Sequence, residues 1–325
     1  MAKLIKNCMF FLSLTLFPLS NSLAMDSEPV KERLIIENGI WGKYLEPNIS
    51  DASKPPILLL GGSDGGIPVE MALTFRNNGF PVLTLGYFSQ DRMKDAVPDF
   101  IPSEFDRIPL ELIGNGLQWI SNKFPKQKIS VVAGSKGAEG FLAFASTGDE
   151  RLLLVHKVLL RSGASYAFEG LYNINTSKSE ATSHSAWTYN GNEIPFIKYA
   201  GNPKIESYYP FKMNVGCIYE KSLKKAGKKN VLDQARFSLE KLSHAQVLFL
   251  SGTKDKIWPS VLMIEELLKY HSMATNIRLY RFEQTGHAIF AAHTDKTEKS
   301  VILFGDTTKE TSGYALKIAL AFLSK

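Results

Sequence analysis

The stretch from Ser130 to Gly140, SVVAGSKGAEG, constrains the fold more than any other part of the chain. An apolar, β-branched run ends in small residues around Ser135, and a helix-forming segment, residues 138–146, follows at once. This order predicts a strand, a tight turn and a helix. A serine on such a turn can present its hydroxyl as a nucleophile when the residues two before and two after it are small, and here these are Ala133 and Gly137. The same pattern occurs as a plain structural turn in parallel sheets, so both interpretations remain open at this point.

Strand and helix signals alternate on both sides of this turn. Residues 57–60 form a continuous apolar run, which predicts a strand buried on both faces, and further strands are predicted at residues 81–85, 156–160, 246–250 and 277–282. Helical patterns occupy residues 68–77, 109–123, 261–270 and 313–323. Asn38 and Gly39, between two β-prone runs, predict an antiparallel hairpin at the start of the domain. The alternation predicts an α/β architecture with a mostly parallel, doubly wound sheet.

A glycine-rich turn, Gly61 to Gly66, follows the first predicted buried strand. It contains no Walker lysine, and its glycines do not have the spacing of a dinucleotide-binding turn. In hydrolases a turn at this place supplies a backbone N–H to the oxyanion of the reaction. A purely structural turn is the alternative, and Asp64 fits a loop or helix-capping role.

The alternation stops between Gly163 and about Ser238. A connection this long without strong periodicity predicts a lid-like or binding insert after the strand that follows the nucleophile helix. Its aromatic side chains either line an acyl pocket or pack the insert onto the sheet; they are Tyr166, Tyr172, Trp187, Tyr189, Tyr208 and Tyr209. Residues 187–191 predict a tight turn, and His184 is expected at the surface.

Three residues with catalytic side chains each follow a predicted strand: Ser135, Asp255 and His287. Their order along the chain is that of the triad in α/β-hydrolases. A serine hydroxyl is a weak nucleophile until a neutral imidazole accepts its proton, and a carboxylate on the other ring nitrogen fixes the imidazole tautomer. Together they predict an α/β-hydrolase fold and serine-dependent catalysis without metal or cofactor. Asp64 and Glu139 remain minor alternatives for the triad acid.

The first 24 residues have the composition of an export signal. Lys3 and Lys6 precede an apolar run at residues 9–19, and Ser22-Leu23-Ala24 has the small-x-small form of a cleavage site. The apolar run is short for a membrane span. We therefore expect residues 25–325 to form one exported domain, periplasmic or secreted, without a stable membrane span. Its one remaining cysteine, Cys217, forms no internal disulfide and is expected to be a small buried side chain.

Charge gives no indication of a nucleic-acid partner. The formal net charge of +6 includes the two lysines of the leader, and no dense basic block with interleaved aromatic residues occurs. The short lysine-rich piece, residues 221–229, predicts a solvated helix end or loop.

Five segments of the chain resemble one known family. They are GGSDGG at 61–66, IPLE at 108–111, GSKGAE at 134–139, SGTKDKIWPS at 251–260 and GH at 286–287. They are similar to the catalytic C-terminal domain of acyl-CoA thioesterases and bile acid-CoA:amino acid N-acyltransferases, and the resemblance runs from about residue 55 to residue 325. The Asp-x-x-Trp-Pro-Ser piece, residues 255–260, is its most specific part.

The resemblance implies that Ser135 is the nucleophile, Asp255 the orienting acid and His287 the base. It also implies an oxyanion hole made of the backbone amides of Lys136 and of the Ser63-Asp64 turn. The elbow residue is serine in the thioesterases of this family and cysteine in its amino acid transferases, so Ser135 implies hydrolysis. Many members carry an N-terminal β-sandwich domain, for which residues 25–54 are too short.

The expected activity is hydrolysis of a small-molecule acyl ester or thioester, most like that of an acyl-CoA thioesterase. Because CoA thioesters are cytosolic, export is consistent with another ester or thioester as substrate. Two alternatives stay open: acyl transfer to an amine or alcohol, and a non-catalytic binding protein of the same fold.

Overall fold

The structure is a computed structural model that describes residues 31–49, 51, 53–91, 96–171, 183–201, 215–228, 231–290 and 307–324. The predicted leader, residues 1–24, lies outside the described residues, as do Tyr172, Tyr208, Tyr209 and the side chain of Cys217. Within the described ranges, no helix has both the length and the apolar character needed to cross a membrane.

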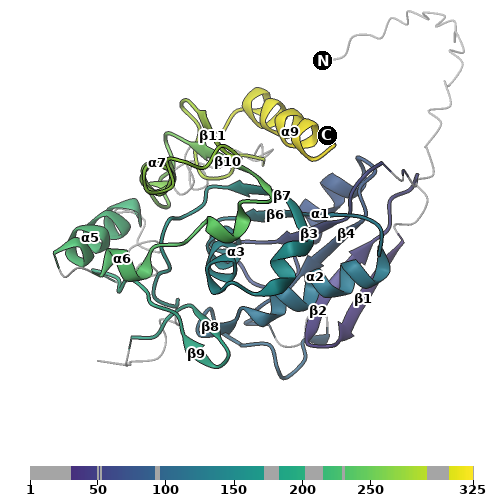
Figure 1. Cartoon of the computed structure of the whole chain (residues 1–325), viewed down its shortest axis with the longest axis horizontal. Helices are drawn as coiled ribbons and strands as arrows, with labels where there is room; N and C mark the ends of the chain where they lie inside the picture. The colour runs from purple at the N-terminus through teal and green to yellow at the C-terminus, as the bar shows by residue number, and fades with distance from the viewer. Residues whose placement is uncertain are drawn as a thin grey trace, which may run out of the picture.

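An eight-stranded sheet forms the centre of the molecule (Figure 1), with strand order β1-β2-β4-β3-β6-β7-β10-β11. Its strands are β1 (Glu32–Glu37), β2 (Ile40–Leu45), β3 (Ile57–Leu60), β4 (Val82–Leu85), β6 (Ile129–Gly134), β7 (Val155–Arg161), β10 (Gln246–Gly252) and β11 (Ile277–Phe282). From β4 to β11 every neighbouring pair is parallel, whereas β1 and β2 are antiparallel additions. The predicted doubly wound, mostly parallel sheet is therefore confirmed.

The antiparallel hairpin at the sheet edge follows from its turn residues. Asn38 and Gly39 both adopt positive φ, 52° and 72°, as a two-residue turn between twisted strands requires. β1 is exposed along most of its length, and β2 is almost wholly buried between β1 and β4. The Asn-Gly pair between two β-prone runs thus predicts the first strand pair correctly.

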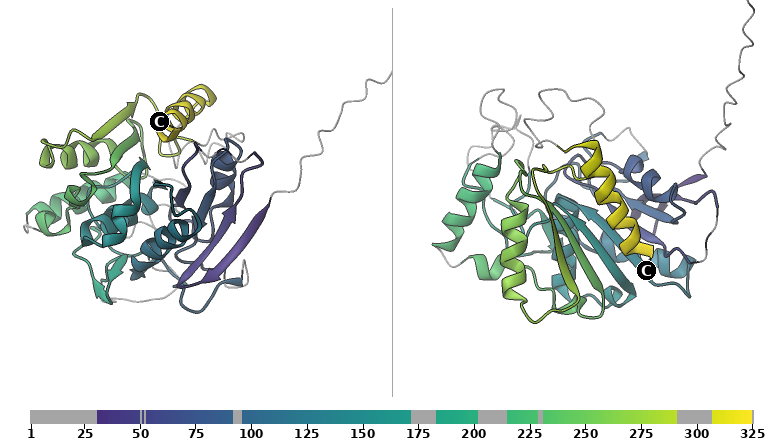
Figure 2. Two further views of the ribbon diagram at one scale, coloured as in Figure 1. Left: turned by 45° about the vertical axis from the view of Figure 1, so that its right-hand side comes forward. Right: turned by 90° about the horizontal axis from the view of Figure 1, so that it is seen from above.

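Helices cover both faces of the sheet (Figure 2). One face packs against α2 (Glu111–Lys123), α3 (Lys136–Thr147) and α7 (Ser260–Tyr270), and the other against α1 (Val69–Arg76) and α9 (Lys309–Ser324). Two short 3₁₀ helices, η2 (Glu150–Leu154) and η3 (Glu240–Leu242), precede β7 and β10. The carboxyl ends of the parallel strands therefore lie at one edge of a sheet that is covered on both sides.

The insert after β7 contains more regular structure than its sequence indicates. Its described part holds β8 (Trp187–Tyr189), β9 (Asn192–Glu193), α5 (Val215–Gly227) and α6 (Leu232–Ala235). β8 pairs with β5 (Ile108–Pro109), the segment just before α2, in a separate three-stranded sheet. The predicted turn at residues 187–191 is confirmed, with positive φ at Asn190 and Gly191.

A third hydrophobic core joins the insert to the start of α7. Its buried members include Tyr166, Phe168 and Tyr219 from the insert, and Trp258 and Met263 from the α7 region. Of the two roles left open for the described aromatic residues of the insert, packing therefore accounts for Tyr166 and Trp187, which are 0% and 1% exposed.

Candidate active site

Ser135 occupies the sharp junction between β6 and α3. Its φ of 54° and ψ of −125° lie in a region that non-glycine residues rarely adopt. The backbone N–H of Ser135 donates to the carbonyl of Arg161 on the neighbouring strand (3.0 Å), and α3 begins at the next residue. Ser135 is partly exposed, although the residues on both sides of it are buried. A strained strand-to-helix turn that presents a serine hydroxyl is the geometry of a nucleophile elbow.

The small residue two positions after Ser135 is required by a close backbone approach. A Cβ at Gly137 would lie 2.0 Å from the carbonyl oxygen of Gly61. The elbow and the glycine-rich turn after β3 are therefore pressed together. Ala133 is accommodated in the core two positions before Ser135.

The glycine-rich turn contacts the serine through Gly62. A Cβ built on Gly62 would lie 3.8 Å from Ser135 Oγ, whereas Ser63 and Asp64 are exposed. The buried hydroxyl of Tyr87 lies within hydrogen-bond distance of the carbonyl oxygens of Gly61 (2.9 Å) and Gly62 (2.5 Å) and shares its one proton between them, which fixes the orientation of this turn. Gly62 belongs to the turn that the sequence places beside the serine, whereas the supporting role of Tyr87 is not predicted from the sequence. The role of the Ser63 and Asp64 amides stays a prediction.

Asp255 and His287 are in direct contact. His287 Nδ1 lies 2.8 Å from Asp255 Oδ2, and both side chains are buried. The other carboxylate oxygen of Asp255 accepts the backbone N–H groups of Ile257 (2.9 Å) and Trp258 (3.3 Å). Because Nδ1 faces the carboxylate, Nε2 remains available to accept a proton.

Close packing at the ends of β10 and β11 brings these two residues together. A Cβ on Gly252 would lie 2.2 Å from the carbonyl oxygen of Thr285, so only glycine allows the two loops this approach. Ser162, just after β7, donates its hydroxyl to the carbonyl of His287 (2.7 Å). The histidine loop is thus held against the strand end next to the elbow.

Ser135 Oγ makes no hydrogen bond to His287 or to any other residue in the described ranges. Nucleophile–base hydrogen bonds are often looser in unliganded structures. The alternative acids are placed elsewhere: Asp64 is exposed, and Glu139 is bonded to Lys136, Phe168 and Trp187.

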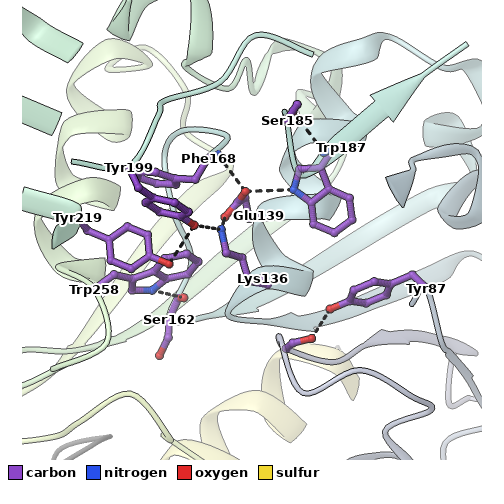
Figure 3. A network of polar contacts seen from close by, with 11 residues as sticks. Tyr87, Lys136, Glu139, Ser162, Phe168, Ser185, Trp187, Tyr199, Tyr219 and Trp258 are labelled. Carbon is purple, nitrogen blue, oxygen red and sulfur yellow. Dashed lines mark hydrogen bonds and ion pairs between the residues drawn. The ribbon is translucent and has the colours of Figure 1, made fainter. Parts of the chain in front are cut away.

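A buried ion pair lies at the start of the elbow helix (Figure 3). Lys136 Nζ donates to Glu139 Oε2 (2.6 Å) and to the hydroxyl of Tyr199 (3.2 Å). The second oxygen of Glu139 accepts the Phe168 backbone N–H and the Trp187 indole N–H, each at 3.1 Å. Lys136 and Glu139 are 2% and 0% exposed, so this pair ties α3 to the insert.

Aromatic rings surround the Lys136 ammonium. Five ring centroids lie 5.3 to 5.9 Å from Nζ, those of Phe105, Phe168, Tyr199, Tyr219 and Trp258. Burial lowers the pKa of Lys136 and raises the pKa of Glu139, and each partner opposes the shift of the other. Trp258 also donates its indole N–H to the carbonyl of Ser162 (2.9 Å) and its ring meets that of His287 at 6.0 Å. The caged pair is therefore connected to both the elbow and the histidine.

The model of one protein family matches residues 108–300, which is more than half of the chain and spans Ser135, Asp255 and His287. That family is described as BAAT / acyl-CoA thioester hydrolase C terminal. No match was found among curated proteins.

Solved structures with similar folds share little sequence with the chain. A putative dienelactone hydrolase from Klebsiella pneumoniae is 10% identical with a TM-score of 0.50, over 91% of this chain and 98% of that one. The Francisella virulence factor BioJ is 14% identical (TM-score 0.49; 90% and 84% covered), and a monoacylglycerol lipase of Paleococcus ferrophilus is 14% identical (TM-score 0.45; 89% and 99% covered). At these identities the likeness concerns the fold, which is the expected α/β-hydrolase fold.

Proposed function

The chain belongs to the BAAT / acyl-CoA thioester hydrolase C-terminal family and has the α/β-hydrolase fold. From that premise we propose that it is a serine hydrolase of acyl esters or thioesters. Ser135 acts as nucleophile, His287 as general base and Asp255 as the acid that orients His287. The observation that carries the proposal is the Asp255–His287 contact of 2.8 Å, in a fold whose elbow carries a strained serine beside a glycine-rich turn.

The mechanism follows from these positions. His287 Nε2 takes the proton of Ser135 Oγ as the oxygen attacks the acyl carbonyl, and the Asp255 carboxylate stabilises the imidazolium through Nδ1–H. The backbone N–H of Lys136 lies at the start of α3, where it has no partner within the helix. With an N–H from the Gly62–Asp64 turn, it stabilises the oxyanion. The leaving group departs with the proton from His287, and water activated by the same imidazole releases the acid.

The caged Lys136–Glu139 pair supports this mechanism from outside the reacting atoms. It fixes the first turn of α3, from which the Lys136 amide points, to the insert and to Trp258. An oxyanion hole contributes to rate only when its donors are held in place before the reaction. We assign Lys136 and Glu139 side chains to that positioning role.

Two further features belong to the proposal. We propose that residues 1–24 direct export, so that the enzyme works in the periplasm or outside the cell. We also propose that the insert, residues 163–238, covers Ser135 as a lid. Hydrolysis is preferred over acyl transfer because the elbow residue is serine.

The test is a substrate panel with matched variants. Purified protein is assayed on p-nitrophenyl esters and acyl-CoAs of short to long chains, with and without glycine as acceptor. We expect hydrolysis, loss of activity in Ser135→Ala, and a fall in kcat of about 10⁴-fold in Asp255→Asn, because the amide holds the wrong imidazole tautomer. Unchanged turnover in Asp255→Asn would reject the triad, and an N-acylglycine product would identify a transferase.

A further inference from the structure

Arg161 is a second cation beside the elbow, and no carboxylate among the described residues is paired with it. It ends β7 and is paired in the sheet with Gly134, the residue before Ser135. Its guanidinium lies flat on that glycine, because a Cβ at Gly134 would meet Nε at 2.6 Å and Cζ at 2.7 Å. Nε is buried without a hydrogen-bond partner in the described part of the chain, and no described carboxylate lies within ion-pair distance of the guanidinium. Part of the residue remains exposed, so a ligand can reach it.

An unpaired guanidinium in this position is costly. Burial lowers the pKa of Arg161 to about 10, which still leaves it charged at neutral pH, and Asp64 and Tyr87 act on it only at a distance. The Phe290 ring, 5.8 Å from Cζ, gives the guanidinium a cation–π contact but neither a counter-charge nor a hydrogen-bond acceptor in the plane of the guanidinium. Removing a cation from water without a counter-charge is unfavourable, and a bound anion would offset part of that cost. The planar fork of arginine fits a carboxylate with two parallel hydrogen bonds.

We propose that Arg161 binds a carboxylate on the acyl part of the substrate, so that the preferred substrates are esters or thioesters of short dicarboxylic acids. This inference rests on the proposed function of Ser135. The acyl part remains attached to Ser135 after the first step, and the guanidinium lies against the residue immediately before it. A carboxylate a few carbons from the scissile carbonyl is therefore held near Arg161, whereas a leaving group departs from the elbow.

The test compares acyl groups that differ only in a terminal carboxylate. Glutaryl and valeryl thioesters are each prepared with CoA and with N-acetylcysteamine, which has no phosphate. We expect kcat/KM to favour glutaryl over valeryl by about 10- to 100-fold with both leaving groups, the usual effect of hydrogen bonds to a charged group. Arg161→Gln should bring this ratio to about 1. Arg161→Lys, which keeps the charge and loses the fork, should retain part of it and serves if the glutamine variant does not fold. Arg278→Gln removes a cation from an exposed position of β11 and should keep the wild-type ratio.

Three outcomes would overturn the inference: a wild-type preference for valeryl, an Arg161→Gln protein with an unchanged ratio, or an effect of Arg161→Gln that follows CoA rather than the acyl carboxylate. The last result would assign the guanidinium to leaving-group phosphates. Calorimetric binding of glutarate and valerate to Ser135→Ala separates this question from turnover. If no thioester or ester is cleaved but glutarate binds and Arg161→Gln abolishes binding, the proposed function fails and the carboxylate site stands.

Discussion

Lys136 and Arg161 are cations on either side of the nucleophile elbow, and their surroundings are opposite. Lys136 is bonded to a carboxylate and a phenol (Figure 3). Five aromatic rings enclose its ammonium. Arg161 lies against one glycine and near one phenylalanine, with its Nε unsatisfied. We infer from this difference that a buried charged side chain with its counter-charge and hydrogen bonds in place stabilises the fold. A buried charged side chain without a counter-charge indicates a site for a charged ligand. The following predictions test that distinction.

Removing the carboxylate of the caged pair should have the largest effect on stability. Glu139→Gln keeps an acceptor for Trp187 and Phe168 but leaves the Lys136 ammonium buried without its counter-charge. Breaking a buried pair from one side lowers the free energy of unfolding by about 3–5 kcal/mol. Urea unfolding measures this, with Glu220→Gln at an exposed position of α5 as the control. Equal midpoints for the two variants would mean that the pair is not structural.

Removing the Lys136 ammonium should lower the free energy of unfolding somewhat less than removing the Glu139 carboxylate, and the loss should depend on pH. In Lys136→Met the Glu139 carboxylate keeps two N–H donors, so we expect a loss of about 2–4 kcal/mol at neutral pH. Burial raises the pKa of Glu139, so the native state binds a proton that the unfolded state releases above the usual value of 4.5. Stability of the variant should therefore fall as pH rises above 4.5 toward the raised pKa.

The double variant Lys136→Met/Glu139→Gln lacks the titrating carboxyl and provides the control. Its unfolding free energy relative to wild type should show less of this fall with pH. A Lys136→Met curve parallel to that of the double variant would contradict the assignment of a charged, caged pair.

Trp258, the aromatic residue near Lys136 that also contacts the His287 ring, should contribute less to the free energy of unfolding. Trp258→Phe keeps an aromatic ring but leaves the buried Ser162 carbonyl without its indole donor. An unsatisfied buried acceptor lowers the free energy of unfolding by about 1–2 kcal/mol. Trp119→Phe, which loses a bond to the exposed Glu37, is the matched control and should change stability less. A larger loss of thermal stability in Trp119→Phe than in Trp258→Phe would count against a structural role of the aromatic rings around Lys136.

Arg161→Met should have the smallest effect on stability, and its sign should be opposite. Replacing an unpaired buried cation by an apolar side chain is neutral or stabilising, by up to about 1 kcal/mol in the absence of ligand. Urea unfolding of the ligand-free protein measures the change beside Lys136→Met. A loss of several kcal/mol would show that Arg161 already has a structural partner, and would remove the contrast between the two cations.

Local sequence patterns predict the central sheet well because its inner strands are rich in apolar, β-prone residues. The strands at 57–60, 156–160 and 246–250 and the helices between them are confirmed with small shifts at their ends. The elbow helix starts two residues earlier than predicted, directly after Ser135. The α5 and α6 helices and the β5-β8-β9 sheet were not predicted, because they are stabilised by contacts with distant segments rather than by a strong periodicity of their own.

For the site, strand ends could be identified from the sequence, but side-chain contacts could not. Asp255 and His287 follow neighbouring strands and are in contact in the structure, while their catalytic roles remain predictions. Lys136 was named only for its backbone amide, and Arg161 was not named at all. The sequence indicates only that Lys136 and Arg161 are charged residues in or at the end of mostly apolar segments. This pattern does not reveal whether a counter-charge lies beside either side chain.

Fluorophosphonate labelling tests the central claim most directly, because it requires an activated serine and no knowledge of the substrate. The folded protein and Ser135→Ala are treated with the probe, and the modified peptide is identified by mass spectrometry. We predict one label, on Ser135, that is absent in Ser135→Ala and much slower to form in Asp255→Asn. A folded wild-type protein that is not labelled, or a label on another residue, would contradict the assignment of Ser135 as the nucleophile.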